Sequence, residues 1–241
     1  MIQFSKRCTL EEQMDDPSLG NQEMAAVFSD LNRTNTLLGG QRITLRAARS
    51  LMERFPREHY TIADLGCGDG DMLRKLAIQC RSAGISSTFI GVDLSEAALA
   101  LAAQKSLAFP EIHYRKANLL DLKKGSDRFD ILLCTLALHH FPDEELPALL
   151  GNFTGLASIG VIINDLQRNR LAYYLFMGFS RIFIKTEIAK QDGLISIRRG
   201  FRRNELLALS KMLPQKEHKI KWRWIFRYLW VIQSKPVPLH E

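Results

Sequence analysis

The sequence predicts an α/β fold in which helices cover both faces of a doubly wound, mostly parallel sheet. Three observations lead to this prediction. Between residues 61 and 164, short apolar segments alternate with segments of helical spacing, an order typical of βαβ units. The first apolar segment runs directly into a glycine-rich loop. Hydrophobic residues make up 46% of the 241-residue chain and charged residues 24%, which is enough to form a buried core.

Each element of this alternation has its own signal. The apolar runs predict strands at 61–65, 87–92, 112–116, 129–134 and 160–164. The helical spacing between them predicts helices at 71–80, 95–107 and 143–150, with Pro147 a weak point in the third. After a further helix at 204–212, the segments 219–224 and 228–233 suit an antiparallel hairpin at the edge of the sheet.

The first 56 residues precede the alternation and predict a separate helical unit. Apolar spacing indicates a helix over 24–38, which Gly39-Gly40 ends. A second helix over 41–55 stops before Pro56. We therefore divide the chain into a helical unit at 1–56 and a domain at 57–241, in which residues 166–201 are an insertion between the last parallel strand and the last helix.

Composition narrows the class of protein. The net charge of +7 favours acidic partners such as nucleic acid, an anionic membrane surface or an acidic small molecule. The charge is not gathered in one block, however, which is typical of an ordinary basic enzyme. The four cysteines lie far apart and the start lacks a secretory signal, so we expect a cytoplasmic protein. No metal is expected, because the histidines and carboxylates lack ligand spacing.

The loop Asp-Leu-Gly-Cys-Gly-Asp-Gly at 64–70 joins a strand to a helix. Its glycines allow a tight turn and a close approach to a ligand, and the helix that follows presents free N–H groups. Dinucleotides and S-adenosylmethionine are both bound in this way. Asp71 stands where the dinucleotide pattern asks for a small residue, and with Asp64 it would repel a pyrophosphate. A sulfonium and an ammonium tolerate these carboxylates, so the charges favour S-adenosylmethionine.

Asp93 ends the second predicted strand. A carboxylate at this place can accept two hydrogen bonds from a ribose diol. The alternative is that Asp93 only caps the next helix, but Ser95 is the better candidate for the cap.

Three motifs together resemble the class I S-adenosylmethionine-dependent methyltransferases. They are the loop at 64–70, Val-Asp-Leu-Ser at 92–95, and Phe-Asp-Ile-Leu-Leu-Cys at 129–134 with Leu-His-His-Phe at 138–141. The resemblance covers about residues 60–165, and within the family the chain looks like bacterial small-molecule methyltransferases of the quinone-biosynthesis type. It implies a Rossmann-like, seven-stranded sheet of order 3-2-1-4-5-7-6 with the last strand antiparallel, and an N-terminal helical lid over the cofactor.

The resemblance also implies which residues bind S-adenosylmethionine. Asp64 would hold the donor's ammonium, Asp93 its ribose, and Leu94 would lie against the adenine. Asn118 stands where the family often has an acidic residue, and its amide oxygen can accept the same hydrogen bond. The remaining cofactor-binding candidates are Gly66, Cys67, Gly68, Gly70, Leu119, Cys134 and Arg42.

Arg42 belongs to the predicted lid. We expect its guanidinium to bind the donor's carboxylate as a bidentate pair, and a solvated surface arginine is the open alternative. Arg42 and Asn35 flank Gly39-Gly40 in the helices that resemble this lid.

Methyl transfer to a hydroxyl requires alignment, exclusion of water and removal of a proton. His139 and His140 follow the fourth strand, and an imidazole is a natural base for such a proton. Asp165 follows the fifth strand, at the end of the sheet where ligands bind. We take His140, His139 and Asp165 as catalytic candidates; that one histidine only packs under the next helix stays open.

The insertion at 166–201 is rich in aromatic and apolar residues, which suits a lid over an apolar or aromatic acceptor. Burial of this face on the core or on a second chain is the alternative, so a monomer and a homodimer are both open. The stretch 171–184 also leaves peripheral membrane contact open. We expect O- or C-methylation of a small molecule.

Two other functions were weighed against this one. A nucleic-acid methyltransferase is disfavoured, because residues 134–137 replace the Asn/Asp-Pro-Pro-aromatic run of base-amino methyltransferases. A non-catalytic protein that binds the cofactor is the other alternative, because a fold alone does not establish an activity.

Overall fold

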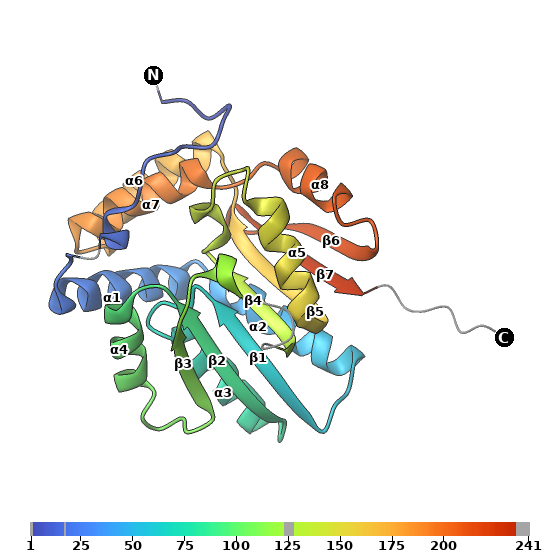
Figure 1. The fold of residues 1–241 in the computed structure, drawn as a ribbon. Coiled ribbons are helices and arrows are strands. Elements are labelled where there is room, and N and C mark those ends of the chain that lie inside the picture. The colour runs from blue at the N-terminus through green and yellow to red at the C-terminus, as the bar shows by residue number, and fades with distance from the viewer. Residues whose placement is uncertain (1, 17, 123–127, 235–241) are drawn as a thin grey trace.

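The computed structural model describes residues 2–16, 18–122 and 128–234, and the end of the predicted domain at 235–241 lies outside this part. One seven-stranded sheet of order β3-β2-β1-β4-β5-β7-β6 runs through the molecule (Figure 1). Strand β7 is antiparallel to both neighbours, β5 and β6, and the other neighbouring strands are parallel. The order and directions that the family resemblance implied are therefore confirmed.

The strands are β1 (His59–Leu65), β2 (Ser86–Asp93), β3 (Ile112–Lys116), β4 (Phe129–Thr135), β5 (Ala157–Leu166), β6 (Lys216–Arg223) and β7 (Arg227–Ser234). The α-helices are α1 (Asn21–Leu37), α2 (Gly40–Arg54), α3 (Asp71–Ser82), α4 (Glu96–Lys105), α5 (Leu146–Leu156), α6 (Arg170–Phe183), α7 (Glu187–Arg199) and α8 (Arg203–Lys211). Short 3-10 turns are η1 (Gln13–Asp15), η2 (Leu119–Asp121) and η3 (Leu138–His140). Each predicted strand falls within an observed one, except that Trp224 lies beyond β6.

The helix predicted at 143–150 is displaced, because α5 begins only at Leu146. Pro147 lies in its first turn. A proline there removes no hydrogen bond that the helix would make, and its fixed φ suits the helical conformation. Pro147 therefore marks the start of the helix, and its interpretation as a weak point was wrong.

Helices pack on both faces of the sheet, as the alternation predicted. On one face Leu51 of α2 and Leu73 of α3 pack with Ile62 of β1. On the other face Phe153 of α5 and Leu206 of α8 contribute to a second buried cluster. The strands between the two layers are apolar on both sides, because helices cover both faces of this part of the sheet.

Helices α1, α6 and α7 and the N-terminal segment lie across the carboxyl end of the parallel strands (Figure 1). Asp30 of α1 accepts hydrogen bonds from the backbone of Lys185 and Thr186, at the start of α7. The insertion at 166–201 thus forms two helices joined to α1. Helix α2 packs mainly on the sheet instead, so the strand ends are covered chiefly by the part of the helical unit before α2. No helix in the described ranges is long and apolar enough to cross a membrane.

Candidate active site

A cavity of about 1140 Å³ lies where the carboxyl ends of β1, β2, β4 and β5 meet α1, α6 and α7. Binding sites for one drug-sized ligand occupy about 300–1,000 Å³. The cavity is therefore large enough for two ligands side by side.

The glycine loop between β1 and α3 forms one wall of this cavity. Gly66, Gly68 and Gly70 have φ values of 74°, 53° and 75°, in the left-handed region that only glycine adopts readily. A Cβ atom at Gly68 would lie 2.6 Å from the ring of Phe28 on α1. The backbone of Gly66, Cys67 and Gly68 lines the cavity, whereas Gly70 does not.

Asp93 links this loop to the end of β2. Its Oδ2 accepts a hydrogen bond of 2.8 Å from the backbone N–H of Gly68, and its Oδ1 accepts one of 3.0 Å from that of Ser95. Ser95 itself caps α4 through its side chain. Asp93 lines the cavity with Leu94, Asn118 and Leu119.

Asp64, at the end of β1, is a buried carboxyl without a complete set of partners. It is 2% exposed and lines the cavity, and its Oδ1 has no hydrogen-bond partner among the described residues. Burial, and then the negative charge of Asp93, raise the pKa of Asp64 to about 8. A cationic ligand group beside Asp64 would supply the missing partner and favour the ionised form.

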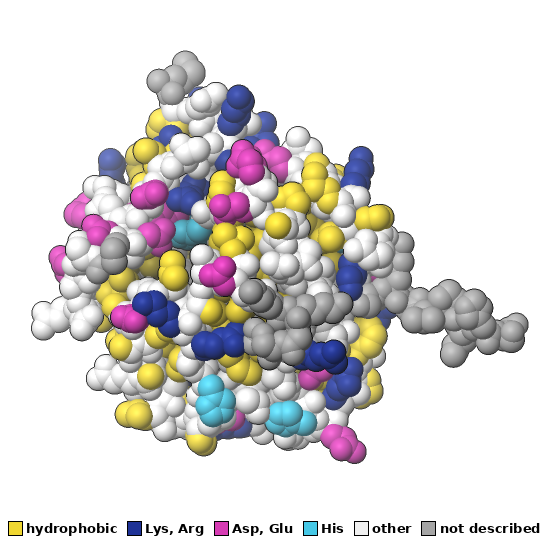
Figure 2. Space-filling view, in the orientation of Figure 1, with side chains coloured by type: hydrophobic (Ala, Val, Ile, Leu, Met, Phe, Trp, Pro, Cys, Tyr) yellow, Lys and Arg dark blue, Asp and Glu magenta, His cyan; other side chains and the backbone are white. Residues whose placement is uncertain are grey.

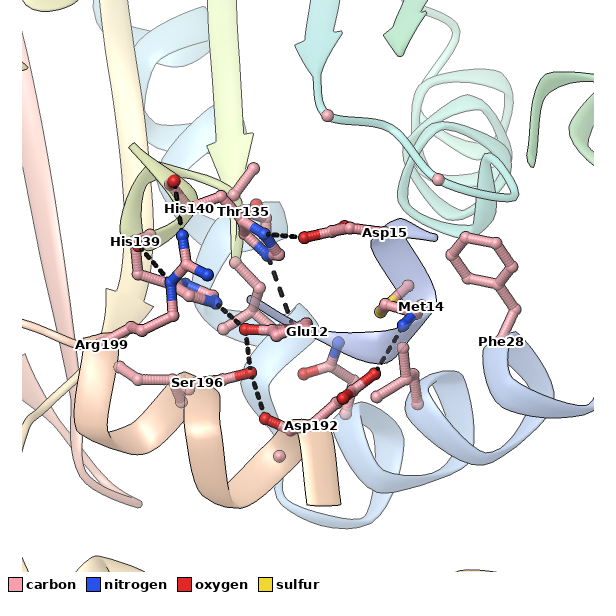
Figure 3. Close-up of a pocket in the computed structure, with 18 of the residues that line it drawn as sticks. Glu12, Met14, Asp15, Phe28, Thr135, His139, His140, Asp192, Ser196 and Arg199 are labelled. Carbon is pink, nitrogen blue, oxygen red and sulfur yellow. Dashed lines mark hydrogen bonds and ion pairs between the residues drawn. The ribbon is translucent and has the colours of Figure 1, made fainter. Parts of the chain in front are cut away.

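Two histidines and two carboxylates meet at the other side of the cavity (Figure 3). The Nδ1 atom of His139 lies 2.7 Å from Oδ1 of Asp165, and its Nε2 atom lies 3.3 Å from Oε1 of Glu12. Burial alone would lower the pKa of His139, but Asp165 and Glu12 raise it to about 9. Burial alone would raise the pKa of Glu12, but His139 and His140 lower it to about 2. His139 is therefore an imidazolium held between two carboxylates at neutral pH.

His140 is the more accessible of the two histidines, with 25% of its side chain exposed. Its Nδ1 atom lies 3.0 Å from Oδ2 of Asp15, and its Nε2 atom lies 3.7 Å from Oε2 of Glu12. Arg199 of α7 fixes the loop by donating to the backbone oxygens of both histidines. Glu12 is fixed in turn by Ser196, whose hydroxyl donates to Oε1 over 2.7 Å.

Comparisons with known proteins agree on one family. A family model described as a methyltransferase domain matches residues 62–158. A ubiquinone biosynthesis O-methyltransferase of Coxiella burnetii is 28% identical over 187 residues, 73% of each chain. A trans-aconitate 2-methyltransferase of Deinococcus radiodurans is 35% identical over 104 residues, 43% of this chain and 36% of that one.

Solved structures share the fold. The plantazolicin methyltransferase BpumL in complex with SAH (S-adenosylhomocysteine) has a TM-score of 0.65 at 15% identity. The similarity covers 88% of this chain and 94% of that one. The magnesium protoporphyrin IX methyltransferase from Synechocystis PCC 6803 with bound SAH has a TM-score of 0.54 at 18% identity, over 81% and 84%. The chain is an S-adenosylmethionine-dependent methyltransferase, and its sheet has the order expected for the class I enzymes. S-adenosylmethionine is its cofactor, as the sequence predicted.

The cavity of the methyltransferase fits this cofactor. The glycine loop leaves its backbone open to a ligand, and the unpartnered oxygen of Asp64 suits the donor's ammonium. When bound, S-adenosylmethionine supplies a methyl group on a positively charged sulfur. Two carboxylates, Asp64 and Asp93, line the same part of the cavity and favour a ligand with positive charge.

Several predicted site residues do not reach the cavity. Arg42 is exposed and does not line it, because the side of α2 turned toward the interior carries Gln41 and Thr44. Cys134 is fully buried behind the wall, and its neighbour Thr135 lines the cavity in its place. We therefore leave Arg42 out of the donor site proposed below. Asp165 also lies behind the wall and acts on the cavity through His139.

The cavity residues that the sequence did not predict include Glu12, Asp15 and Arg227. Glu12 and Asp15 come from a segment without helical or strand periodicity, so no pattern points to them. Glu12, His139 and His140 have potential ligand atoms within 4.8 Å of one another, a grouping that spacing along the chain does not reveal. In this structure these side chains are paired with one another and with Asp15 and Asp165.

Proposed function

We propose that the methyltransferase transfers a methyl group from S-adenosylmethionine to a hydroxyl oxygen of a small, mostly apolar acceptor. The observation that carries this proposal is the imidazole of His140. It lines the cavity beside two carboxylates, those of Glu12 and Asp15. An imidazole at this place in the cavity suits the removal of a hydroxyl proton.

In the donor half, we assign each group of the cofactor to a described residue. Asp64 holds the ammonium, and the N–H groups of the glycine loop border the methionine part. Asp93 accepts hydrogen bonds from the ribose diol. Leu94 and Asn118, which line the cavity beyond β2 and β3, contact the adenine. The hydrogen bond from Gly68 to Asp93 supports this assignment, because it holds both parts of the site in one geometry.

The acceptor half is mainly apolar. Its wall is formed by side chains of α6, α7 and the turn between β6 and β7: Leu175, Phe176, Phe179, Ile197, Trp224 and Phe226. Aromatic walls with few polar groups suit apolar or aromatic ligands. The names of the similar proteins include ubiquinone biosynthesis, trans-aconitate, magnesium protoporphyrin IX and plantazolicin, which supports a small acceptor without identifying it.

His140 and the residues near it have different roles in removing the proton. His140 accepts the proton of the acceptor's hydroxyl, which would leave the oxygen free to take the methyl group that bound S-adenosylmethionine would supply. Asp15, 3.0 Å from Nδ1, stabilises the imidazolium that forms. His139 is already charged, so it acts as a positioning residue that fixes Glu12.

Methylation of nucleic acid finds less support. On the face that Figure 2 shows, the basic side chains of the described residues lie among acidic and hydrophobic ones and do not form a single basic stripe. Sequence-tolerant binding of nucleic acid usually needs such a stripe.

Replacement of His140 by glutamine tests the proposal. We expect the rate of label transfer from methyl-labelled S-adenosylmethionine to a panel of phenols and enols to fall about 10²–10⁴-fold, with unchanged affinity for S-adenosylhomocysteine (SAH). His113→Gln is the matched control, because His113 is exposed on β3. Every assay contains a chelator, so that a metal ion held by Glu12, His139 and His140 cannot contribute to the rate. An unchanged rate in His140→Gln, or methylated products that carry the label only on carbon or nitrogen, would contradict the proposal.

A further inference from the structure

Arg227 is a buried cation that has no role in the proposed donor site or at His140. It begins β7, lines the cavity and is 4% exposed. Its Nη2 atom donates a hydrogen bond of 2.6 Å to Oδ1 of Asn35 on α1. Its Nη1 atom has no hydrogen-bond partner among the residues that the structure describes. The guanidinium is thus only partly satisfied.

The chain makes room for this guanidinium at Gly40. A Cβ atom there would lie 2.6 Å from Cζ of Arg227, so the arginine passes directly beneath the start of α2. Burial lowers the pKa of Arg227 to about 10, against the influence of Asp165. Arg227 is nevertheless charged at neutral pH.

The described side chains do not neutralise this charge by contact. Asp165 acts on Arg227 at a distance, but its Oδ1 atom lies 2.7 Å from His139 and its Oδ2 atom accepts the backbone N–H of His139. Removing a charged group from water without a partner costs several kcal/mol. An anionic group of a ligand in the cavity would provide the missing hydrogen bonds and offset that cost.

The position of Arg227 in the sheet indicates which ligand this is. Between β7 and β1 lie β5 and β4, so the two strands are about 14 Å apart at the usual spacing of about 4.8 Å. The carboxylates assigned to the donor end β1 and β2. Next to Arg227 along the chain is Phe226, which contributes to the apolar wall of the acceptor half.

We propose that Arg227 binds a carboxylate of the acceptor, so that the substrate is an apolar acid with a hydroxyl group. This inference rests on the proposed function, because it assumes that the acceptor's hydroxyl lies at His140. The planar fork of a guanidinium binds a carboxylate with two parallel hydrogen bonds. Arg227 thereby selects and orients the acceptor, and the surrounding apolar wall holds the rest of it.

Binding of matched probes to the SAH-saturated methyltransferase tests this. The probes are benzoate, 2-naphthoate, cinnamate and decanoate, each paired with the alcohol of the same skeleton, in calorimetric titrations. We expect at least one carboxylate to bind at least tenfold more tightly than its alcohol, and Arg227→Gln to abolish the preference. Arg42→Gln is the matched control, since this arginine is exposed outside the cavity, and should keep it.

Each other outcome is decisive. If no pair shows a preference in the wild-type protein, or if the preference survives in Arg227→Gln, the proposal is overturned. It is also overturned if Arg227→Gln weakens SAH binding tenfold while the saturated wild-type protein shows no preference, because Arg227 then holds the donor's carboxylate. If Arg227→Gln does not fold, Gly40→Ala, which displaces the guanidinium, must reduce the preference. These readouts need no turnover, so they stay separate from the His140 test.

Discussion

From the proposed role of Asp64 we expect donor binding to depend on pH. Its pKa of about 8 results from burial and from the charge of Asp93. The donor's ammonium favours the ionised carboxylate, so below about pH 8 binding must release a proton. We expect the affinity for SAH to rise up to tenfold per pH unit between about pH 6 and pH 8, as measured by calorimetric titration.

The variant Asp64→Asn isolates this effect. It should bind SAH at least tenfold more weakly at pH 8 and lose the rise with pH. Glu53→Gln is the control, because Glu53 is an exposed carboxylate on α2. The same rise with pH in Asp64→Asn would show that another group holds the ammonium.

His139 and Glu12 make stability depend on pH in opposite directions. The pKa of His139 is raised from 6.5 to about 9, so its contribution is complete below pH 6.5 and is lost as pH rises through about 9. The pKa of Glu12 is lowered from 4.5 to about 2, so its contribution is complete above pH 4.5 and is lost as pH falls through about 2. Both contributions are complete between pH 4.5 and 6.5.

We therefore expect His139→Gln to lower the free energy of unfolding by about 3–5 kcal/mol at pH 6, the cost of breaking a buried ion pair. At pH 9.5 the loss should be clearly smaller. Urea unfolding at the two pH values measures the difference. An equal loss at both values would mean that His139 is a packed neutral side chain.

At the scale of elements, we expect the contact between the glycine loop and α1 to control the donor site. In Gly68→Ala the new Cβ atom would meet the ring of Phe28 at 2.6 Å, and φ is 53°. Both helix and loop must shift, so we expect SAH affinity to fall more than tenfold in calorimetric titration.

Gly84→Ala provides a matched control for backbone strain. Gly84 has a similar φ of 67°, and a Cβ atom there would meet nothing within 4 Å. This variant should lose about 1 kcal/mol of stability and keep its SAH affinity. If both variants bind SAH equally well, α1 does not control the donor site.

The elements also show why some predictions failed. The strands and the glycine loop have local signals, so their positions followed from short stretches of sequence. The orientation of Arg42 depends on where α2 begins, and the start at Gly40 turns Gln41 inward and Arg42 outward. Pro147 was misinterpreted for a related reason, since its effect depends on whether the helix has already begun.

At the scale of the whole molecule, the two halves of the cavity differ in how far their residues are spread along the chain. The donor candidates that line it extend from Asp64 to Leu119, in the stretch with the strand-and-loop motifs. The other half combines Glu12, His140 and Arg227, which only the folded chain brings together. Sequence patterns therefore predicted the cofactor and the residues that we propose to bind it, but not the carboxylates around the histidines or the buried arginine.

The placement of these residues has a consequence for comparing genomes. The family model matches residues 62–158, which contain the glycine loop and both histidines. Glu12, Asp165 and Arg227 lie outside that range. A match to this region alone therefore carries no information about these three positions. From the proposed roles of Glu12 and Arg227, we expect that grouping such proteins by the residues at these two positions would sort them by the molecules they modify, whatever their ancestry.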